Sequence, residues 1–593
     1  MPKSTQSADI FASTLAECRS ALWTVAAFSF VINILMLATP LYMLQIMDRV
    51  LKSGRGETLL MLTLIAMGAV LVMSILDTLR SSIAMRAGTW INDRLGPVFL
   101  ESSCRARIRG EDPGTDMLRD LGNVQGFVAT QGMAAFFDSP WAPIFIVFIW
   151  SLHPYLGMVA LFSALLLLAL SVVTEWVIHA PHSRADETQI EALRLADVTV
   201  RNAEVVHAMG MMPAMTARWR EMNDVVTQSI HAAGDMSGIM LTTSKFLRSA
   251  VQIAILGVGA WLVVKNQITP GAMIAAAILL GRALAPVEMA IGSWQSFMSA
   301  RMSYERLKQH FANHAPPPER TLLPWPSGHL SIENVSYAAR EGDRAILTDV
   351  SFVVAPGEAL AIVGPSGAGK STICRLLVSL NEPTSGEIRL DGNDLRHWDP
   401  LQLGGAIGYL PQDVELFPGT LRENIARMLP ADDAEVIKAA QLARVHTMIQ
   451  RLPDGYDTVI GDGGLRLSGG QRQRIGLARA VFGLPRIIVL DEPNANLDQA
   501  GESALAEALK ELKQLGHAIV VVGHRASTLS QADSILVVQD GRVAMFGPRD
   551  VVLSAWSEAS ATRGGTDTLP LRRATAPPAA LRSQDQTSEA GAP

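Results

Sequence analysis

Residues 364–372 have the composition of a loop that binds phosphate. The three glycines of this loop let backbone N–H groups turn toward phosphate oxygens, which a side chain would obstruct. Lys370 supplies a cation for the β- and γ-phosphates, and the Ser371 hydroxyl is suited to bind Mg²⁺. The apolar run 360–363 predicts a strand before the loop, and residues 372–380 predict a helix after it. We expect a nucleoside triphosphate to contact Gly364, Pro365, Ser366, Gly367, Ala368, Gly369, Lys370, Ser371 and Thr372.

Two acidic residues after a second apolar run could complete such a site. Residues 485–490 read as a buried strand, and parallel strands present their carboxyl ends at the ligand crevice of an α/β sheet. Asp491 is therefore predicted to face the metal ion, and Glu492 to polarise the water that attacks the γ-phosphate. Taken alone, Glu492 could equally cap the helix that follows Pro493. The phosphate loop upstream favours catalysis.

Three further segments occur in an order typical of one class of ATPase. Gln412 follows a predicted strand end, the segment 467–471 (Leu-Ser-Gly-Gly-Gln) precedes the acidic strand, and His524 ends the apolar run 518–523. Together with the phosphate loop, this order resembles that of ABC-type ATPases. The resemblance implies that ATP is bound, that Gln412 senses the Mg²⁺ ion and the attacking water, and that His524 contacts the γ-phosphate. An isolated histidine is more often structural, so the role of His524 rests on this order alone.

The same resemblance implies that a single copy of the chain does not form a complete catalytic site. In the family, the residues equivalent to Ser468, Gly469, Gly470 and Gln471 approach ATP held by a second nucleotide-binding domain, with a helix N-terminus directed at the γ-phosphate. The chain carries one phosphate loop and one such segment, so we expect a symmetric homodimer. Asp498 occupies the family's D-loop position, and a role as the cap of the following helix is equally compatible.

The adenine-binding position is less regular. Exporters of this class commonly place an aromatic residue ahead of the phosphate loop, where its ring stacks on adenine. In this chain the usual ring position is Ala339, and the aromatic residue is Tyr337, two residues earlier. Alternate residues of a strand point to the same face, so Tyr337 is the expected substitute.

The N-terminal half has a different composition. The chain has 593 residues, of which 49% are apolar and 18% charged, and the apolar excess lies before residue 300. Runs without charge are long enough to cross about 30 Å of hydrocarbon as helices. The last two runs, 249–264 and 266–281, are short and must extend past Arg248 and Arg282 to cross a membrane. A pair of buried helices in a water-soluble domain is the alternative for them. Six spans are predicted, at 20–47, 58–76, two within 139–174, 249–264 and 266–281.

The distribution of Lys and Arg predicts the orientation of these spans. Basic residues gather in the long connections 81–135 and 179–245, and are nearly missing from the short loops between the third and fourth and the fifth and sixth spans. This bias places the long connections and both termini in the cytoplasm. Folded as helix pairs, the connections would project roughly 40 to 50 Å from the membrane at 1.5 Å per residue, as in ABC exporters.

The sequence therefore predicts an all-α transmembrane domain of the ABC exporter type, with six spans, fused to an α/β P-loop NTPase domain with a helical signature subdomain. A net charge of −6 without a basic cluster gives no reason to expect nucleic-acid binding. The expected segments are an N-terminal cytoplasmic segment (1–19), the transmembrane domain (20–312), a linker (313–328), the nucleotide-binding domain (329–556) and a disordered tail (557–593).

Four segments are similar to a narrower family. Residues 40–51, 137–144, 201–210 and 491–498 resemble the inner-membrane ATPases of type I secretion systems, in particular the branch that exports proteases, lipases and other repeat-in-toxin proteins. This resemblance implies a bacterial inner-membrane location, a periplasmic adaptor, an outer-membrane channel, and an unfolded polypeptide cargo with a C-terminal secretion signal. The alternatives are an exporter of a lipid or small molecule and, more remotely, an ATPase that transports nothing.

Three smaller expectations concern individual side chains. Asn33, Thr39 and Gln45 in the first span could line a conduit, but hydrogen bonding between helices is the favoured explanation for them. Pro40 is expected to kink the same span. Cys374 follows the phosphate loop closely and is expected to pack in the core; its position nevertheless suggests that alkylation could inhibit the ATPase.

Overall fold

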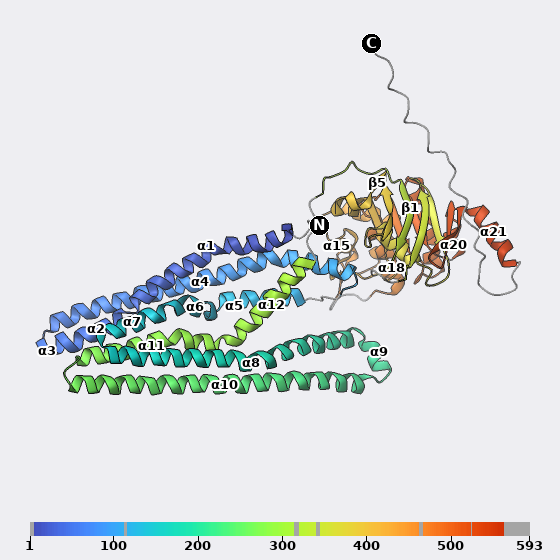
Figure 1. Ribbon diagram of the computed structural model, residues 1–593. Helices are drawn as coiled ribbons and strands as arrows, with labels where there is room; N and C mark the ends of the chain where they lie inside the picture. Colours follow the sequence, from blue (N-terminus) through green and yellow to red (C-terminus); the bar gives the residue numbers. More distant parts are fainter. Residues whose placement is uncertain are drawn as a thin grey trace, which may run out of the picture. The chain divides into compact units, whose positions relative to one another are not determined.

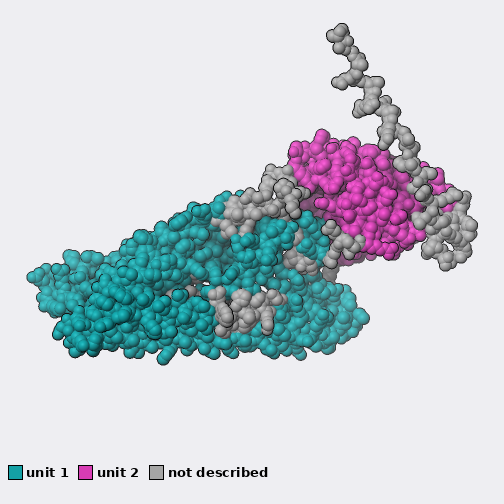
Figure 2. Space-filling view, in the orientation of Figure 1, with its two compact units in different colours: residues 1–317 teal, residues 318–593 magenta. Residues whose placement is uncertain are grey.

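The computed structural model describes residues 5–111, 116–313, 320–339, 344–461, 467–523 and 525–561. They divide into two compact units, one within residues 1–317 and the other within residues 318–593 (Figure 2). Most of the predicted tail and part of the predicted linker lie outside the described residues.

The described residues of the first unit form helices joined by turns and short loops, and long antiparallel helices dominate it (Figure 1). Its elements are α1 (Thr5–Leu35), α2 (Ala38–Gln45), η1 (Ile46–Val50), α3 (Leu51–Ser53), α4 (Gly56–Ile108), α5 (Asp116–Ala129), α6 (Gln131–Asp138), η2 (Ser139–Trp141), α7 (Ala142–Leu152), α8 (Pro154–Arg201), α9 (Ala203–Ala208), α10 (Met212–Val264), α11 (Pro270–Gly292) and α12 (Trp294–Asn313).

Among the described residues, five helical stretches are long and apolar enough to cross a membrane, and a sixth apolar helix is shorter. The five are Ala16–Ser53, Gly56–Ile108, Met133–Leu152, Pro154–Thr174 and Met212–Val264, and the sixth is Pro270–Pro286. The helix of the sixth predicted span, α11, begins at Pro270 and continues past Arg282 to Gly292, as the shortness of its charge-free run requires. The long helices α4, α8 and α10 extend well beyond their apolar parts, as the lengths of the connections predict.

The first span is interrupted where a kink was predicted. α1 ends at Leu35 and α2 begins at Ala38, so the break lies about one turn before Pro40. A proline within a helix clashes with the carbonyl four residues earlier and donates no hydrogen bond of its own. The turn at residues 36 and 37 is the result.

A second irregularity follows in the same span. Residues Ile46–Val50 form a π-helix, η1, in which Asp48 accepts hydrogen bonds from the Thr269 hydroxyl at 2.6 Å and from the Gly271 N–H at 3.4 Å. These groups lie at the start of α11, where helix N–H groups have no partner within the helix and where the helix dipole favours a negative charge. A carboxylate from the first span thus caps the last one.

Small residues allow the spans to pack closely. A Cβ atom on Gly157 of α8 would lie 2.6 Å from the Trp150 ring of α7, and one on Gly259 of α10 would lie 2.6 Å from the Met273 side chain of α11. α11 buries several alanines against α7 and α8. Helices in a membrane associate through such close contacts, because lipid offers the same apolar environment as another helix.

The second unit is an α/β fold. Its larger sheet has the strand order β12-β11-β3-β10-β9-β6, in which β12 alone is antiparallel to its neighbour. β3, β9 and β10 are buried along their whole length, which explains why their sequences are continuous apolar runs. The strands of this sheet are β3 (Ala359–Val363), β6 (Ile407–Leu410), β9 (Ile487–Asp491), β10 (Ala518–Val522), β11 (Ser534–Gln539) and β12 (Arg542–Pro548).

A second sheet and a set of helices complete this unit. The antiparallel sheet has the order β2-β1-β4-β5, and a pair of short strands, β7 and β8, lies apart from it. The helices α15 to α18 are the predicted signature subdomain. The remaining elements are β1 (Leu330–Tyr337), β2 (Leu347–Val354), α13 (Lys370–Leu377), β4 (Ser385–Leu390), β5 (Asn393–Asp394), η3 (Leu395–His397), α14 (Pro400–Ala406), β7 (Gly419–Thr420), α15 (Leu421–Ile425), α16 (Asp433–Leu442), α17 (His446–Gln450), η4 (Gly455–Asp457), β8 (Val459–Ile460), α18 (Gly469–Val481), α19 (Gln499–Gln514), α20 (Ala526–Leu529) and α21 (Arg549–Ala561).

Candidate nucleotide-binding site

The predicted phosphate loop joins β3 to α13. Gly364, Gly367 and Gly369 have φ angles of 156°, 80° and 97°, in the region that glycine favours. At Gly369 a side chain is also excluded by packing, because a Cβ atom would lie 2.6 Å from the Leu347 side chain. α13 begins at Lys370, two residues before the predicted helix, so its first N–H groups face the loop. The loop therefore has the backbone of an anion-binding cradle.

The Lys370 ammonium lies over this loop. Its Nζ donates to the carbonyl oxygens of Gly364 at 2.9 Å and of Pro365 at 2.8 Å. These acceptors are neutral, whereas a phosphate oxygen would offer a charge-assisted hydrogen bond, which is roughly twice as strong. The lysine is thus held where it can turn from the loop carbonyls to a bound phosphate.

Ser371 and Asp491 meet at the carboxyl edge of the sheet. The Ser371 hydroxyl donates to Asp491 Oδ1 at 3.2 Å, and Asp491 is 3% exposed. Burial raises the pKa of the Asp491 carboxyl above its ordinary value, and the neighbouring Glu492 carboxylate raises it further; the Ser371 hydrogen bond and Lys370 act in the opposite direction. A buried carboxylate beside a hydroxyl has the donor atoms that Mg²⁺ prefers.

This donor set fits a metal ion that is shared with phosphate. Among the described residues, no group of three or more His, Cys, Asp or Glu side chains could hold a metal by itself. Mg²⁺ at nucleotide sites is usually held by one or two protein ligands together with phosphate oxygens and water. Ser371 and Asp491 fit that pattern.

Glu492 and Gln412 lie beside this pair. Gln412 Nε2 donates to Glu492 Oε2 at 3.2 Å. Glu492 has a φ of 48°, and its N–H donates to the Val522 carbonyl at 3.1 Å, so the tip of β10 helps to hold this residue. A left-handed conformation is uncommon outside glycine, and such strain gathers at functional sites. The structure thus brings together four predicted residues, two from β9 and its end, one after β6 and one from α13.

His524 lies outside the described residues. Its nearest described neighbour in β10 is Val522, which pairs with Asp491 in the parallel sheet. The role that the sequence predicts for His524 therefore remains a prediction.

The signature residues form the start of α18. Ser468 Oγ accepts from the Gln471 N–H at 3.3 Å, and Gln471 Oε1 accepts from the Ser468 N–H at 2.8 Å, which is a reciprocal capping box. A Cβ atom on Gly470 would lie 2.8 Å from the carbonyl oxygen of Asn496, so this position requires glycine. Asn496 was not predicted as a site residue, although it lies within the segment 491–498 that resembles type I secretion ATPases.

Two further predicted residues have structural roles as well. Asp498 caps α19, because its Oδ1 accepts from the Gly501 N–H at 2.8 Å. The helix-cap interpretation of Asp498 is thus confirmed, and it does not exclude a contact with a second copy. Tyr337 ends β1, is half-buried and pairs with Leu347 of β2, whose side chain lies against Gly369 of the phosphate loop. Tyr337 therefore lies on the loop's side of the domain.

Comparisons with known proteins extend over both units. The model of the ABC transporter family matches residues 347–495, and that of the ABC transporter transmembrane region matches residues 22–284. The chain is 40% identical to the type I secretion system ATP-binding protein PrsD of Rhizobium meliloti, over 91% of this chain and 94% of the relative. It is 29% identical to the cyclolysin secretion/processing ATP-binding protein CyaB of Bordetella pertussis, over 92% and 77%.

Solved structures include a similar chain. The structure of a bacterial Atm1-family ABC exporter with ATP bound matches with a TM-score of 0.80 at 25% identity, over 93% of this chain and all of the other. A single alignment thus covers the helical unit and the α/β unit together.

Proposed function

This chain belongs to the family of type I secretion ABC transporters, and we propose that it exports an unfolded polypeptide with a C-terminal secretion signal. It is a multi-pass membrane protein and an ATPase. The observation that carries the proposal is the 40% identity to PrsD over 91% of the chain, because this alignment includes the helical unit, which is more specific than the ATPase motifs.

We assign the binding of the ATP phosphates to the phosphate loop and Lys370. Glu492 polarises the attacking water, and Gln412 orients both that water and the Glu492 carboxylate. A Mg²⁺ ion bound by Ser371, Asp491 and Gln412 would neutralise charge on the phosphates. The hydrogen bonds Ser371–Asp491 and Gln412–Glu492 support this arrangement. His524 would contact the γ-phosphate, and Tyr337 would stack on adenine.

The working form is proposed to be a homodimer. The capping box at Ser468 fixes the N-terminus of α18, whose dipole favours an anion. One chain supplies one phosphate loop and one signature segment, so two chains would form two complete sites. Ser468, Gly469, Gly470, Gln471 and Asp498 would then contact ATP held by the partner.

The proposed location is the bacterial inner membrane, with the α/β domain in the cytoplasm. Basic residues in the connections 81–135 and 179–245 support this orientation. We place the linker at 313–328, a range that includes the division between the two compact units. The partners are a periplasmic adaptor and an outer-membrane channel, as the secretion role of the relatives suggests.

The test is to compare proteins in the culture medium. Mass spectrometry would be applied to a strain with the intact gene, a deletion strain, and the deletion strain carrying either the intact gene or its Glu492→Gln variant. We expect one or a few proteins to disappear on deletion, to return with the intact gene, and to stay missing with Glu492→Gln. Deleting the adaptor gene should have the same effect as deleting this gene.

A lipid or small-molecule exporter predicts a different result. The proteins in the medium would then be the same in all strains, and deletion of the adaptor would leave transport by this chain intact. Either result would overturn protein export while leaving the ATPase assignment in place.

A further inference from the structure

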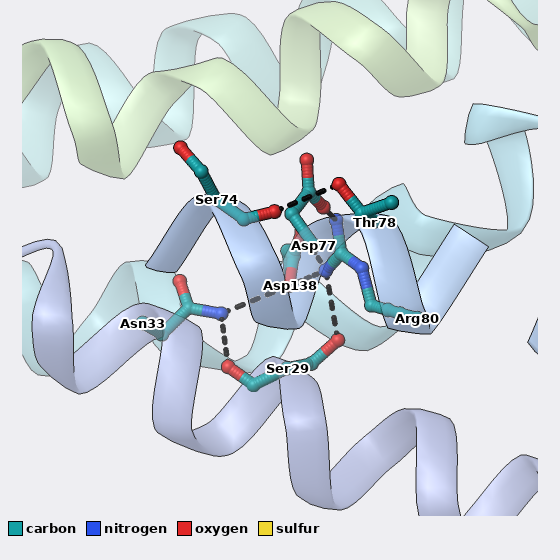
Figure 3. A network of polar contacts seen from close by, with 7 residues as sticks. All are labelled: Ser29, Asn33, Ser74, Asp77, Thr78, Arg80 and Asp138. Carbon is teal, nitrogen blue, oxygen red and sulfur yellow. Dashed lines mark hydrogen bonds and ion pairs between the residues drawn. The ribbon is translucent and has the colours of Figure 1, made fainter. Parts of the chain in front are cut away.

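A buried network of polar residues joins three helices of the first unit (Figure 3). Arg80 of α4 donates through Nη1 to both oxygens of Asp138, the last residue of α6, at 3.0 and 3.1 Å. The same Nη1 donates to the Ser29 hydroxyl of α1 at 2.9 Å, and Asn33 of α1 donates to Asp138 Oδ1 at 2.9 Å. The side chains of Arg80 and Asp138 are 11% and 6% exposed. Asn33 therefore forms a hydrogen bond between α1 and α6, which is the explanation that the sequence favoured over a conduit.

Arg80 also contacts a second carboxylate, on its own helix. Its Nη2 donates to Asp77 Oδ1 at 2.7 Å, and the Asp77 side chain is 54% exposed. Asp77 is the first charged residue after the charge-free run 58–76, so the network lies at the end of the second span nearer to the long connection. The guanidinium is therefore held between a buried partner on α6 and a partly exposed partner on α4.

We propose that this network is a latch that opens and closes between α4 and the pair α1–α6 during the ATP-driven cycle. If α4 moves away, Arg80 keeps Asp77, because both belong to α4. Asp138 keeps Asn33, because Asn33 lies on α1 and also donates to the Ser29 carbonyl there at 2.8 Å. Each charge retains a partner in both arrangements, which lowers the cost of separating a buried ion pair.

Another buried ion pair in the same unit is built differently. Both oxygens of Asp120 of α5 accept hydrogen bonds from α12, from Arg306 at 2.6 and 2.7 Å and from Ser303 at 2.9 Å. Asp120 is fully buried, and all of these donors would leave with α12. Separating α5 from α12 would thus take these donors from the buried Asp120 carboxylate, whereas Asp138 would keep Asn33.

The latch can be tested by measuring the distance between α4 and α6. The full-length protein in lipid nanodiscs would carry spin labels at Ser81→Cys and Ser139→Cys, two exposed serines next to Arg80 and Asp138. Cys104→Ser removes the exposed natural cysteine, and the other two are buried. Continuous-wave electron paramagnetic resonance, whose line broadening reports only spin pairs this close and so excludes labels on the partner, would compare the nucleotide-free protein with the Glu492→Gln variant in ATP.

The nucleotide-free protein should give the shorter distance, and ATP should lengthen it by about 1 to 5 Å, between a small helix shift and a displacement by one helical turn. Asp138→Asn, which removes the charge that holds the closed arrangement, should give the longer distance without ATP. Arg80→Lys should also give the longer distance, because a single ammonium cannot hold both Asp77 and Asp138. This variant replaces Asp138→Asn in the test if Asp138→Asn fails to fold. Asp77→Asn removes the alternative partner and should reduce the population at the longer distance in ATP.

Asp93→Asn is the matched control, since it removes the same charge from an exposed position of the same helix, and it should leave both distances unchanged. The latch is wrong if neither ATP nor the Asp138 and Arg80 variants change the distance. It is equally wrong if Asp77→Asn gives the same distances as Asp93→Asn.

Discussion

The two units treat their polar side chains in opposite ways. In the α/β unit, polar groups at the ends of β6 and β9 and at the start of α13 converge on one edge of the sheet, where Asp491 is buried at the cost of a raised pKa. In the helical unit, buried charges bond to one another, as Arg80 does to Asp138 and Asp120 to Arg306. The first arrangement keeps donors and acceptors available for a ligand; the second satisfies them within the fold.

The largest expected effect concerns Glu492. If this carboxylate is the acceptor for the attacking water, Glu492→Gln should lower ATP hydrolysis by about 10²- to 10⁴-fold, the usual contribution of a general base. Binding of ATP should persist, because the loop and Lys370 are unchanged. Phosphate release and binding of a fluorescent ATP analogue measure the two effects separately.

Glu507→Gln is the control, since Glu507 is an exposed residue of α19 that lies 3.6 Å from Arg444. It should hydrolyse ATP at the normal rate. Near-normal turnover of Glu492→Gln would remove Glu492 from its assigned role.

Lys370 tests whether the α/β unit reserves charge for a ligand. Lys370→Ala should weaken ATP binding by roughly 10- to 100-fold, the loss expected for one charge-assisted hydrogen bond or two. Unfolding of the ligand-free protein should change little, because Nζ bonds only loop carbonyls there. Lys510→Ala, an exposed lysine of α19, is the control. Equal ATP affinity in the two variants would contradict the role of Lys370.

Asp120 tests the opposite behaviour, in which polar groups serve the fold. Asp120→Ala should destabilise the protein by about 3 to 5 kcal/mol, because it removes one side of a buried ion pair. Asp197→Ala, which breaks an exposed pair with Arg201, should cost at most about 0.5 kcal/mol. Thermal unfolding in detergent compares them. Similar midpoints for the two variants would show that the buried pair does not stabilise the unit.

The smallest effect is expected at Cys374. The structure makes the suggested sensitivity to alkylation unfavourable, because this thiol is fully buried and burial raises its pKa well above the ordinary value. Maleimide at neutral pH should modify the exposed Cys104 and leave both Cys374 and ATPase activity unchanged. Raising the pH moderately should not help, since the thiol stays protonated. Peptide mapping after labelling gives the answer, and rapid modification of Cys374 in the folded protein would contradict the burial.

The sequence predicted the nucleotide site in detail because nucleotide chemistry sets short-range patterns. Glycines around Lys370 and the acidic pair at 491–492 mark strand ends by themselves, and the structure brings them together as expected. The start of α13 at Lys370 was missed by two residues, since a helix end depends on local geometry that composition does not define.

The polar contacts of the helical unit were largely beyond prediction. Arg80 and Asp138 are separated by 58 residues, and nothing in either local sequence identifies the other as its partner. Asn33 was recognised as a polar residue in a span, and a hydrogen bond between helices was favoured for it, but its partner could not be named. Such pairs are decided by how helices pack, and the period of apolar residues in a span gives little information on the face that meets each neighbour.

The cap that Asp48 places on α11 has a consequence for biogenesis. Thr269 is synthesised 221 residues after Asp48, which takes roughly 10 to 40 s at 5 to 20 residues per second. During that interval the nascent first span carries a carboxylate whose final hydrogen-bond donors do not yet exist. Membrane insertion of the early spans must therefore precede their final packing, and a chain that stalls in translation before residue 269 leaves this carboxylate without these two hydrogen-bond donors.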